Sequence, residues 1–192
     1  MNNLILASSS PFRKNLLERL QKPFECDSPD INESRHAGEL PETYVKRLSL
    51  EKARTVAPRH QNNLIIASDQ CSLLGNAISG KPLNRQTAIK QLQKSSGQRV
   101  SFFTGLCVLN SSNGKYLLDM VPYYVDFREL SLPEIERYLD AEQPYNCAGS
   151  FMAEGLGITL FKKLEGDDPS ALIGLPLIRL CEMLREFELK LP

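Results

Sequence analysis

The spacing of apolar residues predicts a chain that alternates short buried strands with amphipathic helices. The apolar runs at residues 3–7 and 64–67 are too short for helices and are typical of buried strands, the second of which should end in Ser68-Asp69-Gln70. A helix is expected to begin at Ser10-Pro11, because serine caps a helix well and proline lacks only an N–H that the first turn leaves unused. Apolar residues at helical spacing predict a second helix over residues 41–57.

The later part of the chain continues this alternation and ends in a helix. The predicted elements are a helix that ends near Gly97, strands over 99–110 and 115–128 joined by the turn Ser111–Gly114, a helix from a capping box at Ser131–Glu134 to about Ala141, and a helix over 176–187 with Leu177, Leu180, Cys181 and Leu184 inward. We therefore expect one domain over residues 1–192 with an α/β (α+β) fold. It should contain an elongated mixed β-sheet flanked by helices, in two lobes with a central cleft.

Composition narrows the classes of partner. The chain has 192 residues, with 23 Lys plus Arg and 23 Asp plus Glu, so its formal net charge is zero. A zero balance argues against a nucleic-acid partner, because such binding needs a basic surface. No apolar stretch approaches the ~18 residues of a membrane span, and the first apolar run is too short for a signal peptide. We therefore expect a cytoplasmic protein with no membrane partner.

The segment Ser8–Lys14 is the first candidate for binding chemistry. It joins a predicted strand to a helix start, where hydroxyls, backbone N–H groups and the positive end of the helix dipole meet the cations Arg13 and Lys14. That combination suits a phosphate, although the chain has no G-x-x-x-x-G-K-[ST] loop. The alternative is a capped helix whose basic first turn is only solvated.

Asp69 is the second candidate, because open sheets often place functional groups where an apolar strand ends. Its carboxylate could hold Mg²⁺ or accept a proton from an attacking water. The alternative is that it caps a turn. Glu33, in a polar loop, is a weaker candidate for a second carboxylate ligand, and Lys52 and Lys81 could each contact a phosphate; the alternative for all three is a solvated surface charge.

Several short segments follow one another in an order that resembles the Maf family, the septum-formation-inhibitor-like proteins. The resemblance covers essentially the whole chain and is specific through the joint order and spacing of the segments. They are Leu4–Arg13, Tyr44–Leu48 with Glu51-Lys52-Ala53, Ser68-Asp69-Gln70, Gly80-Lys81-Pro82, Ser96-Gly97, Thr104-Gly105, Phe127-Arg128, Ala148–Phe151 and Gly174-Leu175-Pro176.

The resemblance implies a nucleoside triphosphate pyrophosphatase that requires Mg²⁺ or Mn²⁺ and has an elongated two-lobed fold, usually as a homodimer. By matching position, Asp69 is implied to be the catalytic acidic residue and Glu33 a carboxylate near the metal. The residues implied to surround the phosphates are Ser10, Arg13, Lys52 and Lys81. On this basis Asp69 activates a water that attacks the α-phosphorus, directly or through the metal.

Three positions separate branches of that family, and here they hold Phe12, Gln70 and Glu154. The pattern of an aromatic residue, Gln and Glu resembles the branch that acts on 7-methyl-GTP, although Phe stands where Trp is commoner. The chemistry agrees, because N7-methylation makes guanine cationic and an aromatic face attracts a cation by ~0.5–2 kcal/mol. A carboxylate can also accept from both N1–H and N2–H of guanine. Taken without the resemblance, Phe12 could equally be a core residue and Glu154 a solvated one.

Two other functions remain open from the sequence. The first is a dTTP/UTP pyrophosphatase of the same family. The second is a nucleotide-binding regulator of cell division that does not hydrolyse its ligand.

Overall fold

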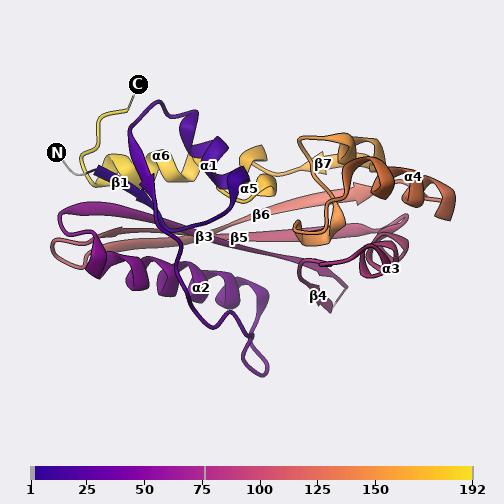
Figure 1. The fold of residues 1–192 in the computed structure, drawn as a ribbon, viewed down its shortest axis with the longest axis horizontal. Helices are drawn as coiled ribbons and strands as arrows, with labels where there is room; N and C mark the ends of the chain where they lie inside the picture. Colours follow the sequence, from indigo (N-terminus) through magenta and orange to yellow (C-terminus); the bar gives the residue numbers. More distant parts are fainter. Residues whose placement is uncertain (1–2, 76, 192) are drawn as a thin grey trace. The chain divides into compact units, whose positions relative to one another are not determined.

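The computed structural model describes residues 3–75 and 77–191. Its elements follow the chain in Figure 1 as β1 Asn3–Leu6, α1 Pro11–Glu18, β2 Phe24–Cys26, α2 Pro41–Val56, the short 3-10 helix η1 Ala57–Arg59, β3 Asn63–Leu74, β4 Ala77–Ser79, α3 Arg85–Ser95, β5 Arg99–Asn110, β6 Tyr116–Phe127, α4 Leu132–Glu142, the 3-10 helices η2 Ala148–Ser150 and η3 Leu156–Leu160, β7 Phe161–Glu165, α5 Pro169–Ile173 and α6 Leu177–Glu186.

The described residues form a seven-stranded mixed sheet. Its strand order is β2-β1-β3-β5-β6-β7, and β4 pairs with β3 off this path. β1 runs parallel to β2 and β3, whereas the pairs β3–β4 and β6–β7 are antiparallel. The expected α/β fold, a mixed sheet flanked by helices, is confirmed.

The chain divides into two compact units. The first unit contains the residues through Asp69, Thr104–Val121 and the residues from Asp168 on, and the second contains Gln70–Phe103 and Pro122–Asp167. The strands β3, β5 and β6 each contribute residues to both units. A cleft between two lobes stays a prediction.

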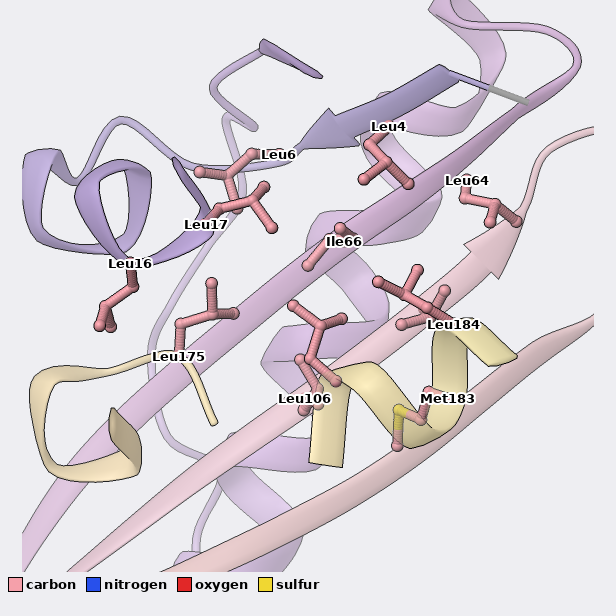
Figure 2. Packing of buried hydrophobic residues seen from close by; sticks show 12 residues of the cluster. Leu4, Leu6, Leu16, Leu17, Leu64, Ile66, Leu106, Leu175, Met183 and Leu184 are labelled. Atoms are coloured by element: carbon pink, nitrogen blue, oxygen red, sulfur yellow. The ribbon is translucent and has the colours of Figure 1, made fainter. Parts of the chain in front are cut away.

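In the first unit, alternate strand residues serve two separate apolar clusters. Figure 2 shows the first cluster, in which Leu4 and Leu6 of β1 lie with side chains from α1 and α6. Ile5, between them, belongs to the second cluster, with Ala53 and Val56 of α2. Successive side chains of a strand point to opposite faces, so helices cover both faces of the sheet in this unit. This three-layer packing fixes α1 and α2 on the strands that carry the candidate residues.

The second unit is built around its own aromatic cluster. The rings of Phe151 and Phe161 have centroids 4.8 Å apart, and Phe102 and Phe127 lie edge-on to Phe151 at 5.3 and 5.7 Å. Beside it, α3 contacts α4, whose predicted capping box between Ser131 and Glu134 is present. This cluster forms an apolar core within the second unit.

The predicted end of the 64–67 strand is wrong. The strand β3 runs to Leu74, so Asp69 lies within it and not at its end. The polar run Ser68–Gln70 looked like a strand end, but the strand continues because Ser72 pairs with Ser79 of β4. The polar side chains at positions 68 and 69 are tolerated because they find partners inside the fold.

The predicted inward face of the last helix needs one correction. Leu180 and Leu184 of α6 are buried as expected. Cys181, which was predicted to face inward, is only half-buried, and Met183 is fully buried instead. Met183 follows Leu180 by three residues, a spacing that places both on one helical face. Leu177 is only partly buried against the same cluster.

No helix within residues 3–75 or 77–191 has the length and apolar character needed to cross a bilayer.

Candidate active site

Asp69 and Lys52 form a buried ion pair in the first unit. Asp69 lies on β3 with its side chain 10% exposed, and Lys52 lies on α2 with its side chain 8% exposed. Lys52 Nζ donates to Asp69 Oδ1 at 2.6 Å. Lysines are almost never buried without a partner, so this contact distinguishes Lys52 from the solvated lysines of the chain.

Glu33 shares the same ammonium. Its Oε1 lies 2.8 Å from Lys52 Nζ, and its side chain is 58% exposed. One cation therefore bridges a buried carboxylate and a carboxylate that reaches solvent. The structure thus brings together the two residues that the sequence predicted as metal ligands.

The loop that carries Glu33 is fastened to α2 by side chains that the sequence analysis did not assign. Tyr44 Oη donates to the Glu33 carbonyl at 2.9 Å, and Arg47 Nη2 donates to the Ser34 carbonyl at 3.1 Å. Arg47 also pairs bidentately with Glu39, through Nε at 2.7 Å and Nη2 at 2.8 Å. Hydrogen bonds from Arg47 lower the pKa of Glu39 from 4.5 to about 2. Tyr44 and Arg47 lie one helical turn apart on α2, and this spacing is the sequence signal that could have indicated that both side chains face the same loop.

The start of α1 is built as predicted. Ser10 has extended backbone angles, and its Oγ accepts the Arg13 N–H at 3.4 Å, with Pro11 in the first turn. The Ser10 N–H donates in turn to the buried Ser8 hydroxyl at 3.1 Å. These contacts fix the turn that presents Arg13.

Arg13 is oriented by a carbonyl from far along the chain. Its Nε donates to the Gly174 carbonyl at 2.9 Å, and its Nη1 lies 3.5 Å from Ser8 Oγ. The buried Ser68 hydroxyl lies 2.8 Å from the same Gly174 carbonyl and 2.7 Å from the Gly105 carbonyl. Residues from β1–α1, β3, β5 and α5–α6 therefore meet around Arg13.

The electrostatics of Arg13 link it to the two carboxylates. Burial lowers the pKa of Arg13 below its usual value of 12.5, and the negative charges of Asp69 and Glu33 oppose that shift. Arginine stays protonated in proteins, so the guanidinium is a permanent cation in the field of both carboxylates. Arg13, Glu33, Lys52 and Asp69 form one charged cluster, which we call the carboxylate–cation cluster.

Gly105 allows α2 to approach the sheet closely enough to place Lys52. A Cβ at this position would lie 2.3 Å from the Val45 carbonyl oxygen and 2.7 Å from Ser49 Oγ, both on α2. Only glycine fits such a backbone contact without displacement of the helix.

The second unit contains Lys81 and Glu154, and both are exposed. Both act on the Cys147 thiol, whose pKa is raised to about 11: burial is the main cause, the charge of Glu154 also raises the pKa, and the charge of Lys81 lowers it. Lys81 and Glu154 thus act on one thiol of this unit. Convergence of Lys81 with the carboxylate–cation cluster stays a prediction.

The turn that carries Glu154 is held by α4. Tyr138 Oη accepts the Met152 N–H at 3.1 Å, and the Glu142 carboxylate accepts the Leu156 N–H. The turn is tight, because a Cβ on Gly157 would lie 2.3 Å from the Met152 carbonyl oxygen. Tyr138 and Glu142 were not predicted; their spacing of four residues on one helix is the signal that could have identified them.

Phe12 and Gln70 are both half-buried, Phe12 on α1 and Gln70 directly after Asp69 on β3. Because side chains alternate along a strand, Gln70 and Asp69 point to opposite faces of β3. The role of Phe12 and Gln70 in choosing a base stays a prediction.

Glu33 and Asp69 suit a hard divalent cation. Carboxylate oxygens are preferred ligands of Mg²⁺ and Mn²⁺, and nucleotide enzymes bind Mg²⁺ with one or two carboxylates plus substrate phosphates. The two carboxylates converge on one point, with oxygens 2.8 and 2.6 Å from Lys52 Nζ. Within the described ranges, no group of three or more His, Cys, Asp or Glu could hold a metal. Two carboxylates alone would leave the remaining positions around such an ion to other ligands.

Comparison with known proteins identifies the family. A model of the Maf-like proteins matches residues 3–187. The chain belongs to the Maf family. Its relatives include the 7-methyl-GTP pyrophosphatase of Alcanivorax borkumensis, 56% identical over 98% of this chain and 96% of that protein. The 7-methyl-GTP pyrophosphatases of Colwellia psychrerythraea and Pseudomonas aeruginosa are each 51% identical, over 97% and 100% of this chain and 93% and 100% of their own length.

Among solved structures, the nucleoside-triphosphatase / dITP/XTP pyrophosphatase of Mycobacterium abscessus is similar with a TM-score of 0.46 and 16% identity, over 96% of this chain and 97% of that chain.

The structure gives physical reasons for several of the Maf segments recognised in the sequence. Ser68, Gly105 and Gly174 meet through hydrogen bonds around the Arg13 guanidinium. The segment Tyr44–Leu48 holds the Glu33 loop. These segments are distant in sequence but lie in the same unit. Their joint presence in the sequence therefore reflects the contacts that they make with one another in the fold.

Proposed function

We propose that this Maf-family chain hydrolyses 7-methyl-GTP to 7-methyl-GMP and diphosphate. Relatives named 7-methyl-GTP pyrophosphatase match it at 51 to 56% identity over nearly the whole chain. The structural observation that supports the proposal most is the Lys52 ammonium, 2.6 Å from Asp69 and 2.8 Å from Glu33. Fixed charges of both signs are what catalysis of phosphoryl transfer requires, because it depends on positioning and electrostatic stabilisation.

The cations of the first unit have distinct tasks in this proposal. Arg13 binds the polyphosphate, since its protein contacts use Nε and Nη1 and its other N–H groups suit phosphate oxygens. Lys52 compensates the charge of Asp69 and Glu33 before the nucleotide binds and then neutralises charge that develops on the phosphates. The Ser10 hydroxyl caps α1, whose N-terminal N–H groups favour an anion. Lys81 is a further phosphate ligand in this proposal, a role that follows only from the match of Gly80-Lys81-Pro82 to a Maf segment.

The reaction also needs a general base and a group that neutralises the charge on the phosphates. Asp69 accepts a proton from the water whose oxygen attacks the α-phosphorus. The new P–O bond forms as the bond between the α-phosphorus and the oxygen that bridges to the β-phosphorus breaks, and diphosphate leaves with that oxygen. Mg²⁺ or Mn²⁺, when bound by Glu33 and Asp69, supplies Lewis-acid neutralisation of the phosphate oxygens.

Base recognition is assigned to Phe12, Gln70 and Glu154. The Phe12 ring attracts the cationic 7-methylguanine, and the Glu154 carboxylate accepts from N1–H and N2–H. The exposure of Glu154 supports this assignment, because an exposed carboxylate on a braced turn can meet a ligand without disturbing a core.

A panel of nucleotides tests the function directly. Release of diphosphate from 7-methyl-GTP, GTP, dTTP and UTP is measured at equal concentration with Mg²⁺ under multiple-turnover conditions. We expect 7-methyl-GTP to be the best substrate, and Asp69→Asn to lose activity toward all four. Full activity of Asp69→Asn contradicts the catalytic assignment. Preference for dTTP and UTP indicates the other branch, and binding without turnover indicates a regulator.

The remaining expectations are separate proposals. They are the identity of the metal, a homodimer and a cytoplasmic location. Calorimetry with Mg²⁺ and Mn²⁺, sedimentation of the purified protein and cell fractionation test them in turn.

A further inference from the structure

Asp168 is a buried carboxylate with no role in the proposed reaction. It is 3% exposed, and its Oδ1 accepts the Ser170 N–H at 3.0 Å and the Ser170 hydroxyl. Its Oδ2 accepts the Ile178 N–H at 2.8 Å. The donors in these contacts are neutral groups from two helix starts.

These contacts join α5 to α6. Asp168 is the N-cap of α5, whereas α6 begins after Pro176, whose side chain provides no cap. Asp168 therefore serves both helices, and Ser170 reinforces it by accepting the Leu177 N–H at 2.7 Å. Helix N-termini favour a nearby carboxylate, which offsets part of the cost of burying this charge.

The segment between the two helices carries the carbonyl that orients Arg13. Gly174 ends α5 with a φ of +115°, a conformation that L side chains rarely adopt. Its carbonyl accepts from Arg13 Nε at 2.9 Å and lies 2.8 Å from the Ser68 hydroxyl. A shift of α5 against α6 moves this carbonyl, and with it the plane of the guanidinium.

We infer that Asp168 is a positioning residue for the Arg13 guanidinium, acting through the Gly174 carbonyl. The inference rests on the proposed function, in which Arg13 binds the polyphosphate. A capping role alone needs an acceptor at one helix start, which a serine supplies. The two oxygens of the Asp168 carboxylate each bind one helix start, so the carboxylate fixes the distance between the starts of α5 and α6. The Gly174 carbonyl belongs to the segment that joins these two helices.

A double-mutant cycle tests this relation. Asp168→Asn keeps the side-chain shape but turns an NH₂ group toward one of the two helix starts, so one acceptor is lost. We expect kcat/KM for 7-methyl-GTP to fall by up to about 100-fold, because a displacement near 1 Å can cost that much. In an Arg13→Met background the same change should cost less than about 3-fold, whereas in a Lys81→Met background it should cost as much as in the wild type.

The matched control is Asp167→Asn, which changes the preceding, exposed aspartate in the same way. It should leave kcat/KM and the melting temperature unchanged. Asp168→Ser provides a second variant if Asp168→Asn does not fold, because serine still caps α5 but does not reach the Ile178 N–H. Equal losses from the change at Asp168 in the wild-type, Arg13→Met and Lys81→Met backgrounds overturn the inference and leave a structural role.

Binding of inorganic pyrophosphate separates this inference from the proposed function. If the wild type hydrolyses no nucleotide, the proposed function fails, but calorimetry still measures pyrophosphate affinity. We expect that affinity to fall with Arg13→Met and with Asp168→Ser, and not to fall further in the double variant. Pyrophosphate binding that does not depend on Arg13 overturns the inference.

Discussion

The two compact units hold their candidate residues in opposite ways. In the first unit, Lys52 and Asp69 have side chains only 8 and 10% exposed and contact each other directly. In the second, Lys81 and Glu154 are exposed, and the Glu154 turn is fastened through its backbone by Tyr138 and Glu142. Charges that stabilise a transition state must be fixed in place before the reaction. Side chains that select a base can instead lie on turns, where replacement leaves the core intact.

This contrast gives a general expectation. Changes in the carboxylate–cation cluster should reduce turnover of every nucleotide alike and also alter stability. A change at the exposed Glu154 of the second unit should alter the ranking of nucleotides and leave stability almost unchanged.

The largest effect is expected from Lys52→Met. Removal of the ammonium leaves Asp69 and Glu33 without their shared cation, and we expect kcat/KM to fall about 100- to 1,000-fold for all nucleotides. Steady-state kinetics across the panel measure it. Lys46→Met on the same helix is the control and should retain activity. A loss confined to 7-methyl-GTP would contradict the assignment of Lys52 to the phosphates.

A smaller effect is expected from Gly105→Ala. The added Cβ would lie 2.3 Å from the Val45 carbonyl oxygen, so α2 must move, at a cost of about 1–3 kcal/mol in the free energy of unfolding. Urea unfolding measures the change, and turnover should fall as Lys52 shifts. Gly80→Ala is the control, because a Cβ there meets no atom within 4 Å. Unaltered stability of Gly105→Ala would refute the close packing of α2.

The two residues assigned to base recognition, Phe12 in the first unit and Glu154 in the second, should respond through selectivity. Phe12→Arg with Glu154→Gln should reduce the preference for 7-methyl-GTP over UTP about 10-fold or more, because a stacking partner and a charge-assisted acceptor are lost. The ratio of kcat/KM values measures this preference. Glu154→Gln alone should leave the melting temperature unchanged, and Glu136→Gln on α4 is its control. An equal loss for every nucleotide would refute the specificity argument.

The smallest effect concerns acid stability. The bonds from Arg47 hold the pKa of Glu39 at about 2, below its ordinary 4.5, so the folded state favours the ionised carboxylate. This stabilisation is fully present above pH 4.5 and disappears as the pH falls toward 2. Arg47→Met should therefore cost about 1 kcal/mol at neutral pH and progressively less in acid.

Urea unfolding at several pH values between neutral pH and pH 2 measures this difference. Arg137→Met on α4 serves as the control. A wild-type advantage over Arg47→Met that stays constant down to pH 2 would exclude Glu39 as its source.

Much of the fold could be predicted because it depends on local signals. The Ser10-Pro11 start of α1, the Ser131–Glu134 capping box and the Ser111–Gly114 turn each act within a few residues. The elements that were missed, β4, β7 and α5, contain three to five residues each and have little periodicity. The predicted end of β3 came too early for a different reason. The partners of Ser68 and Asp69 come from distant segments, so no local pattern shows that these polar residues lie within a strand.

The sequence by itself determined the alternation of strands and helices, the family and the identity of the candidate side chains, because these depend on residue type and on order along the chain. The tertiary structure alone decided that one ammonium bridges Asp69 and Glu33, that a carbonyl near the C-terminus orients Arg13, and that Asp168 joins two helix starts. The contacts of Lys52 and Arg13 join residues far apart in sequence and form only when packing brings strands and helices together. The contact between Asp168 and Ile178 spans only ten residues, but it depends on how α5 and α6 are placed against each other.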